Sequence, residues 1–192
     1  PFSKVEYLRG KEERDWGILP RKESEYDDVQ VVDYAIDFLE NHSGEAFFLS
    51  VGTFHPHLPW YIPKRYRDLY ADSKIHLPAT LRDDLDDVPA IGKHWAARRR
   101  DEMEAAKDAG EWEEAVRCYL ASISFADAQV GRVLEALAES PYSDNTIIIL
   151  WSDHGWHLGE KDHWHKSTLW EEATRVPFII ATPNMKTAGK TS

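Results

Sequence analysis

Cysteine, long apolar runs and excess positive charge are all scarce in this sequence. The 192 residues include a single cysteine, Cys118, which excludes an internal disulfide framework and a cysteine-rich zinc site. The longest purely aliphatic or aromatic runs, among them 147–151 and 47–49, are far shorter than the roughly 20 residues that a membrane helix needs. The sequence therefore predicts a protein without a membrane-spanning segment.

The balance of charge is acidic. Lysine and arginine number 23 and aspartate and glutamate 34, so the net charge is 23 − 34 = −11. An acidic surface repels phosphates, and we expect no nucleic-acid partner, although a local positive site remains compatible with an anionic substrate. The chain begins Pro1-Phe2-Ser3, without a methionine or an apolar leader. We therefore expect either a processed start or a piece of a longer chain.

The order of apolar and polar segments predicts an α/β fold with a largely parallel sheet flanked by helices. Residues 1–25 are polar and predict an irregular lead-in, and 54–63, with three prolines, predicts irregular structure. Residues 72–94 predict an acidic loop. The other predicted elements are helices over 27–40 and 112–137, strands over 46–53, 146–151 and 176–182, and one or two helical turns over 167–172.

Histidines gather in the two loops that follow predicted strands. Six of the nine histidines fall in 54–63 and 152–166. In open α/β sheets, ligands bind beyond the carboxyl ends of the strands. The clustering therefore marks these two loops as the candidate functional region.

The loop after 146–151 opens with Asp153, His154 and Gly155. Neighbouring side chains on a strand point to opposite faces, so Asp153 and His154 converge only if the chain turns, which Gly155 permits. A carboxylate there suits Ca²⁺ or Mg²⁺, and His154 is an alternative hydrogen-bond partner for a bound anion. A loop-capping aspartate beside a surface histidine explains these residues equally well.

Lys166 closes the same loop and is a point-charge donor for a sulfate or phosphate oxygen, although a solvated lysine is the commoner situation. In the other loop, Pro56 and Pro59 stiffen the chain around His55 and His57. Such a histidine can protonate a leaving oxygen or bind an anion. The alternative is a proline-rich loop that only packs aromatic side chains against the core.

Two other metal sites are weaker interpretations. His154, His157, Asp162 and His163 do not match a standard zinc spacing, so zinc hydrolysis remains a distant alternative. The acidic run 83–87 lacks the glycine and the alternating oxygen ligands of a Ca²⁺ loop, which favours a solvated loop.

Three segments together resemble the sulfatase family, in particular its iduronate-2-sulfatase-like branch within the alkaline phosphatase superfamily. They are 47–70 (FFLSVGTFHPHLPWYIPKRYRDLY), 119–134 (YLASISFADAQVGRVL) and 146–166 (TIIILWSDHGWHLGEKDHWHK), followed by 174–178 (TRVPF). The resemblance runs in register from about Tyr26 to Thr182. It implies that 26–192 is the C-terminal portion of a sulfatase catalytic domain, incomplete at its N-terminal side.

The resemblance implies hydrolysis of a sulfate ester, of a small molecule or a saccharide, with Ca²⁺ (or Mg²⁺) and a formylglycine made from cysteine. It implies metal binding by Asp153 and His154 and catalytic roles for His57 and Lys166. It also implies substrate contacts by His55, Trp156, His157 and His165; His55 stands where close relatives often have lysine. The family further implies a periplasmic, secreted or lysosomal location, while no signal in the sequence names a compartment.

One departure from the family pattern concerns the nucleophile. The Cys-x-Pro-x-Arg motif and the preceding Asp-Asp pair of the family are absent, and Cys118 within the predicted long helix reads as a core cysteine. We therefore expect that this chain alone does not turn over sulfate esters and that the formylglycine belongs to the full-length enzyme. A phosphodiesterase or phosphonate hydrolase of the same superfamily, and a non-catalytic binding module, are the alternatives.

Overall fold

The computed structural model describes residues 3–5, 11–185 and 189. These residues form two compact units. The first unit comprises the described residues up to Leu77 together with Glu104–Ser140. The second comprises Pro78–Met103 and the described residues from Pro141 onward.

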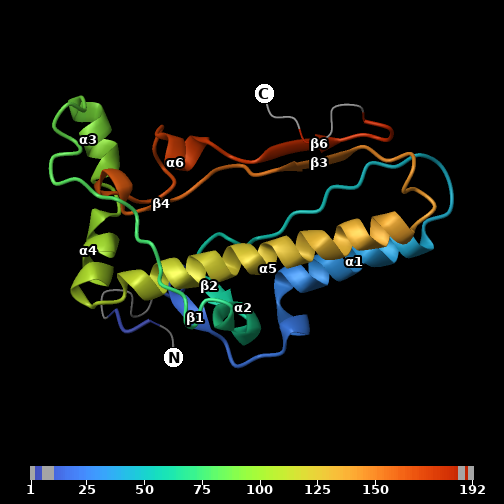
Figure 1. Cartoon of the computed structure of the whole chain (residues 1–192), viewed down its shortest axis with the longest axis horizontal. Helices are drawn as coiled ribbons and strands as arrows, with labels where there is room; N and C mark the ends of the chain where they lie inside the picture. The colour runs from blue at the N-terminus through green and yellow to red at the C-terminus, as the bar shows by residue number, and fades with distance from the viewer. Residues whose placement is uncertain (1–2, 6–10, 186–188, 190–192) are drawn as a thin grey trace. The chain divides into compact units, whose positions relative to one another are not determined.

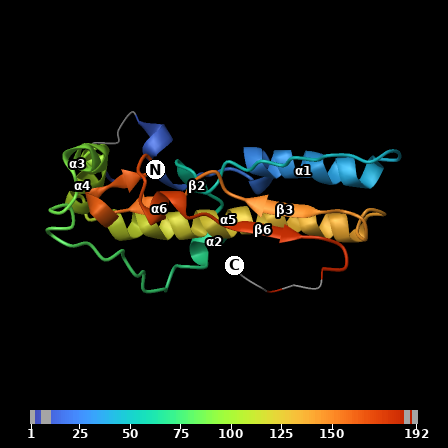
Figure 2. The same ribbon diagram turned by 90° about the horizontal axis from the view of Figure 1, so that it is seen from above.

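Two helices form the framework of the first unit. The predicted helices are confirmed as α1 (Asp27–Asn41) and α5 (Trp112–Glu139), which lie side by side (Figures 1 and 2). The apolar residues of each helix recur with the helical period, so each presents one apolar face to the other. The buried cluster between them and the neighbouring elements consists of Tyr26, Val29, Ile62, Tyr66, Ala121 and Phe125.

A short parallel sheet and three small helical segments complete the first unit. The strands β1 (Trp16–Ile18) and β2 (Trp60–Ile62) pair in parallel, with Trp16 opposite Trp60. The lead-in is thus not wholly irregular, and the prediction that 54–63 contains no regular structure is wrong for β2. The prolines flank β2 instead of interrupting it, so its backbone donors remain available. The helical segments are η2 (Glu12–Arg14), η3 (Glu23–Glu25) and α2 (Lys64–Asp68).

The second unit contains a four-residue antiparallel ribbon. The predicted strands at 146–151 and 176–182 are confirmed as β3 (Ile148–Trp151) and β6 (Phe178–Ala181). They pair in antiparallel register, with Trp151 opposite Phe178 (Figure 2). The remaining elements are α3 (Ala90–Ala96), β4 (His157–Leu158), η4 (Glu160–Asp162), β5 (Trp164–His165) and α6 (Glu171–Thr174), with α4 (Arg100–Asp108) crossing the boundary between the units.

The predicted strand over 46–53 is wrong for the structure as it stands. The segment is extended, and exposure alternates from residue to residue, with Phe48 93% exposed and its neighbours half-buried. No backbone ladder joins it to another segment in the described part of the chain. A strand exists only with a hydrogen-bonded neighbour, which a local pattern cannot supply.

The fold class is α/β, but a largely parallel sheet is not what the described residues contain. Their strands form three separate two-stranded sheets, of which β1–β2 is parallel while β3–β6 and β4–β5 are antiparallel. The predicted acidic loop 72–94 also includes the start of α3 at Ala90. Among the described helices, none has both the length and the apolarity that crossing a membrane requires.

Candidate functional site

Asp153, His154 and Lys166 come together in the second unit, at the end of β3. The Lys166 Nζ lies 2.8 Å from Nε2 of His154. The same ring nitrogen lies 3.6 Å from Oδ2 of Asp153. The sequence placed these three residues at the two ends of one loop, and the structure brings those ends together.

The hydrogen bonds define the state of the His154 ring. Its Nδ1 lies 2.8 Å from the Gly155 carbonyl oxygen, which can only accept, so Nδ1 carries the proton. Nε2 then holds the lone pair that accepts from the Lys166 ammonium. Asp153 is 77% exposed and His154 22%, so the group faces solvent at its carboxylate. The arrangement offers a lysine cation, held in place by a neutral imidazole, to an incoming oxyanion.

Gly155 is required here for space. A Cβ on this residue would lie 2.1 Å from the carbonyl oxygen of Glu172, and the Gly155 amide donates to the Ala173 carbonyl at 2.8 Å. The loop therefore packs backbone to backbone against α6, and any side chain at this position would separate them. The sequence suggested Gly155 for its conformational freedom, whereas close approach is the reason that the structure shows.

Three predicted substrate contacts lie inside the second unit. His157 is fully buried, with Nδ1 3.1 Å from the Glu160 carbonyl and Nε2 2.7 Å from Oγ1 of Thr168. His165 places Nε2 2.7 Å from the Glu102 carboxylate, and its ring packs against Trp156 at 4.8 Å between centroids. These contacts give the three side chains structural roles, and their contact with substrate stays a prediction.

Two further residues of this region are Glu102, which the sequence did not single out, and His163, which it named only in the weak zinc interpretation. Glu102 on α4 is buried and binds both His165 and Arg99, the latter at 3.2 Å. His163 is fully buried, with Nδ1 3.0 Å from the Ala96 carbonyl, and burial lowers its pKa to about 4. Burial also lowers the pKa of His157. Both rings are therefore neutral near pH 7, which suits packing and does not suit anion binding.

The loop that carries His55 and His57 belongs to the first unit. His55 is held on both sides, with Nδ1 2.7 Å from Oδ2 of Asp28 and Nε2 3.1 Å from the Tyr61 carbonyl. The Nδ1 of His57 donates to the Leu58 carbonyl at 2.7 Å, so a neutral His57 ring has its lone pair on Nε2. The role of His55 as a substrate contact stays a prediction, and Asp28, its anchor, was missed by the sequence.

The described residues do not fit a Ca²⁺ or Mg²⁺ ion by themselves. Ca²⁺ takes six to eight oxygen ligands, and Asp153 supplies at most two. Both nitrogens of His154 are engaged, one with Gly155 and one with Lys166. Within residues 3–5, 11–185 and 189, no group of three or more histidine, cysteine, aspartate or glutamate side chains converges on a common point. Metal binding by Asp153 and His154 therefore remains a prediction, and no chemical step is assigned to a metal here.

Cys118 is a core residue of α5. It is 1% exposed, its Sγ lies 3.7 Å from Oε1 of Glu114, and burial raises the pKa of its thiol. A buried, protonated thiol is a poor nucleophile and is inaccessible to a modifying enzyme. Its position agrees with the interpretation of Cys118 as a packing residue.

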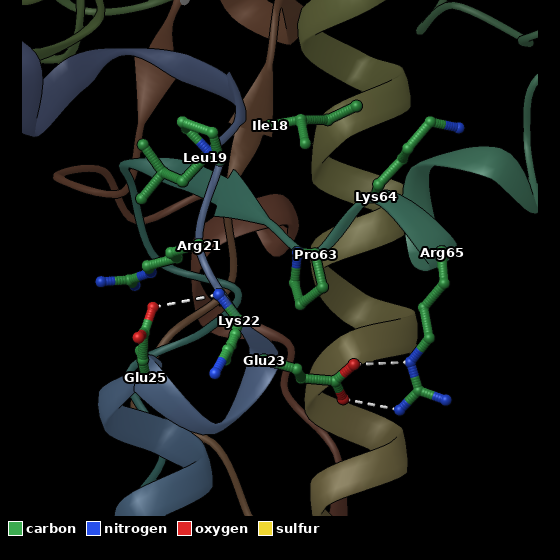
Figure 3. A pocket seen from close by; sticks show the side chains of 10 residues that line it. Ile18, Leu19, Arg21, Lys22, Glu23, Glu25, Pro63, Lys64 and Arg65 are labelled. Carbon is green, nitrogen blue, oxygen red and sulfur yellow. Dashed lines mark hydrogen bonds and ion pairs between the residues drawn. The ribbon is translucent and has the colours of Figure 1, made fainter.

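A surface hollow of the first unit contains none of the predicted site residues. It has a volume of about 680 Å³ and is lined by side chains from Ile18 to Glu25 and from Pro63 to Arg65 (Figure 3). The Arg65 guanidinium is bound to the Glu23 carboxylate by hydrogen bonds of 2.6 and 2.7 Å. This arginine is therefore already paired with a carboxylate inside the hollow.

Comparison with known proteins decides the family. The family model described as Sulfatase matches residues 3–192. The chain belongs to the sulfatase family. It is 41% identical over 177 residues to a sulfatase of Formosa agariphila, and the match covers 92% of this chain and 35% of that protein. It is 35% identical over 178 residues to human iduronate 2-sulfatase, covering 86% of this chain and 32% of that protein. The chain thus spans about a third of the length of these relatives.

Solved structures of the superfamily share the fold. One was determined in complex with its substrate D-glucosamine-2-N,6-O-disulfate; it has a TM-score of 0.67 and 25% identity, and the match covers 87% of this chain and 45% of that one. Another is a phosphonate monoester hydrolase from Silicibacter pomeroyi, with a TM-score of 0.72 and 27% identity over 86% of this chain and 34% of that one. The α/β fold is therefore that of the sulfatases and their phosphonate-cleaving neighbours. Sulfatases as a family use a metal ion and a formylglycine.

Proposed function

We propose that this chain is the C-terminal portion of the catalytic domain of a sulfate ester hydrolase acting on a sulfated saccharide or small sulfate ester. The observation that carries the proposal is the 2.8 Å contact between Lys166 and His154, with the Asp153 carboxylate beside them after an apolar strand. The family match over residues 3–192 supports the same conclusion.

Lys166 is the residue we assign to the sulfate. Cleavage of a sulfate ester develops negative charge on the sulfate oxygens and on the leaving alcohol oxygen, and a fixed cation stabilises that charge. The hydrogen bond to His154 holds the ammonium at the loop surface until an oxyanion replaces the imidazole as its acceptor. His57, in the first unit, is proposed to give the Nε2 proton of its imidazolium form to the leaving oxygen while its Nδ1–H stays on the Leu58 carbonyl. Asp153 is proposed to hold the Ca²⁺ or Mg²⁺ of the full enzyme.

Sulfate titration by calorimetry tests this assignment. We expect weak sulfate binding by the 192-residue chain and a loss of about fivefold or more in affinity in Lys166→Gln, because a charge-assisted hydrogen bond is removed. Lys161→Gln is the matched control, since Lys161 stands on the same loop but is bound to Asp84 at 2.5 Å. Equal sulfate affinity in wild type and Lys166→Gln would contradict the proposal.

Turnover provides a second test. Because the single cysteine is buried in α5 and the motif around it is not that of a formylglycine site, we expect no hydrolysis of an aryl sulfate by this chain alone. Robust hydrolysis that is abolished by Asp153→Ala would overturn that expectation.

Phosphonate monoester hydrolysis is the second candidate function. The likeness to the phosphonate monoester hydrolase from Silicibacter pomeroyi supports it. Parallel titrations with sulfate and methylphosphonate separate the two. Stronger Lys166-dependent binding of methylphosphonate would favour phosphonate hydrolysis, and stronger binding of sulfate would favour the sulfatase.

A further inference from the structure

Asp28, in the first turn of α1, accepts three hydrogen bonds from one distant segment. Its carboxylate lies 2.7 Å from the Phe54 amide nitrogen, 3.0 Å from the His55 amide nitrogen and 2.7 Å from Nδ1 of His55. The side chain is 3% exposed, and all three donors lie 26 or 27 residues further along the chain. All three bonds of Asp28 therefore hold the start of the loop that carries His57.

His55 connects this carboxylate to β2. Its Nδ1 donates to Asp28, and its Nε2 donates to the Tyr61 carbonyl at 3.1 Å. Both acceptors are oxygens, so the ring is held from both of its nitrogens. The ring also packs against Phe125 of α5, at 5.1 Å between centroids. His55 thus fixes the beginning of the loop relative to its end and to both long helices.

Phe54 passes this constraint on to His57. The Phe54 carbonyl accepts a hydrogen bond of 3.0 Å from the His57 amide, and the two rings pack at 5.2 Å between centroids. The Phe54 amide is itself held by Asp28. The path from Asp28 to the His57 ring therefore runs through one residue.

We propose that Asp28 and His55 form a positioning pair that sets the orientation of the His57 ring for proton transfer; this role rests on the proposed function. The ordinary role of an acidic residue at a helix N-terminus does not account for Asp28. Asp27, which precedes it, is exposed and can serve the helix dipole equally well, whereas Asp28 turns inward onto the loop.

Electrostatics agree with this geometry. Burial alone would raise the pKa of the Asp28 carboxyl, but the hydrogen bonds from the His55 ring and from the Phe54 and His55 amides outweigh burial and hold the pKa below its usual value. The carboxylate thus stays ionised at neutral pH and keeps its three donors. The two histidines of the loop are therefore assigned different tasks, His55 to hold the loop and His57 to act on the substrate.

Histidine-ring ¹⁵N spectra and amide exchange of the 192-residue chain test the pair. In Asp28→Asn we expect exchange of the Phe54 and His55 amides to speed up by about tenfold or more, because the bonds to a charged acceptor are lost. We also expect the His57 ring signals to move from a fixed Nδ1–H tautomer to a tautomeric average. Asp27→Asn, with the same charge change one residue away, should leave both unchanged. Unchanged His57 ring signals in Asp28→Asn would overturn the proposal.

A second pair of variants separates positioning from folding. The amide nitrogen of asparagine reproduces the Nδ1 donor of histidine, and that of glutamine reproduces the Nε2 donor. His55→Asn should keep the bond to Asp28 and the His57 signals, whereas His55→Gln should lose both. Identical His57 signals in these two variants would overturn the proposal. So would loss of the folded state in all three variants at positions 28 and 55, which would assign the pair to stability alone.

Failure of the proposed function is recognised separately. If sulfate binds neither the wild type nor any variant, the sulfatase assignment of this chain fails while the ring spectra still decide whether Asp28 and His55 orient His57. If sulfate binding depends on Lys166 but the His57 ring signals are unchanged in Asp28→Asn, the positioning role of Asp28 and His55 is wrong and the proposed function stands.

Discussion

At the scale of single residues, the histidines divide into buried and working groups. His157 and His163 are fully buried with lowered pKa values, while His154 is paired with Lys166 near the surface. Sequence alone could not make this division, because histidine serves as metal ligand, as acid or base and as packing residue. Burial and partner identity separate them.

His163 should make the stability of the fold fall in mild acid. Its pKa is about 4 in the folded state and near 6.5 when unfolded, so the unfolded chain binds the proton first as pH drops. Stability is therefore retained above pH 6.5 and falls between about 6.5 and 4, by an amount on the order of 1–3 kcal/mol. Urea denaturation of wild type and His163→Asn at several pH values measures the difference.

The matched control for that experiment is His76→Asn, which replaces an exposed histidine. It should keep the wild-type dependence on pH, whereas His163→Asn should flatten it. The same slope in all three proteins would show that protonation of His163 does not oppose folding.

At the scale of elements, the sequence predicted those helices and strands that a local pattern of apolar residues determines. The helices at 27–41 and 112–139 follow from apolar periodicity, and the strands β3 and β6 from short apolar runs. The segment 46–53 has the same apolar character but lacks a partner strand in the described chain, so the apolar pattern alone wrongly predicts a strand there. β2 was missed because the prolines on either side of this three-residue strand made the whole segment look unable to form regular structure.

The candidate site divides in the same way. The proximity of Asp153, His154 and Lys166 could be predicted because they share one loop, and their roles stay predictions. Asp28 and Glu102 were missed because their histidine partners lie 27 and 63 residues away in sequence. Contacts of that separation are set by the packing of elements and leave no local signal.

Phe125 should be central to the stability of the buried cluster of the first unit. Its ring is fully buried and packs against Tyr26 at 5.4 Å and Tyr66 at 5.2 Å. Phe125→Ala is expected to lower the free energy of unfolding by about 3–5 kcal/mol, since it removes buried apolar area and leaves a cavity. Ile123→Ala, at a 40% exposed position of the same helix, should cost far less. Equal losses in chemical denaturation would show that this cluster is not the core.

At the scale of the whole molecule, the ribbon of β3 and β6 exposes large apolar side chains. Trp151 and Phe178 are paired across β3 and β6 and are 65% and 66% exposed. Ile149 and Ile179 are each 55% exposed. Exposed apolar patches of this kind mark binding or aggregation surfaces.

The chain should therefore self-associate through this ribbon when it is purified. We expect binding of a hydrophobic dye and a sedimentation coefficient that rises with concentration, both reduced by the double substitution Trp151→Thr and Phe178→Thr. Threonine keeps the preference for strand structure while removing most of the exposed apolar area. Tyr34→Thr, at a 73% exposed position on α1, is the control and should change neither. A chain that stays monomeric and binds no dye would contradict this.

The central claim is that Lys166, held by His154, receives a tetrahedral oxyanion, and the ¹⁵N signal of His154 Nε2 during a sulfate titration tests it most directly. We expect sulfate to replace the imidazole as the acceptor of the ammonium, so that Nε2 loses its hydrogen bond and its signal moves in proportion to bound sulfate. In Lys166→Met the signal should already lie at that end point, and sulfate should no longer move it. A His154 signal that does not change at saturating sulfate, or that changes identically in Lys166→Met, would show that Lys166 does not receive the oxyanion.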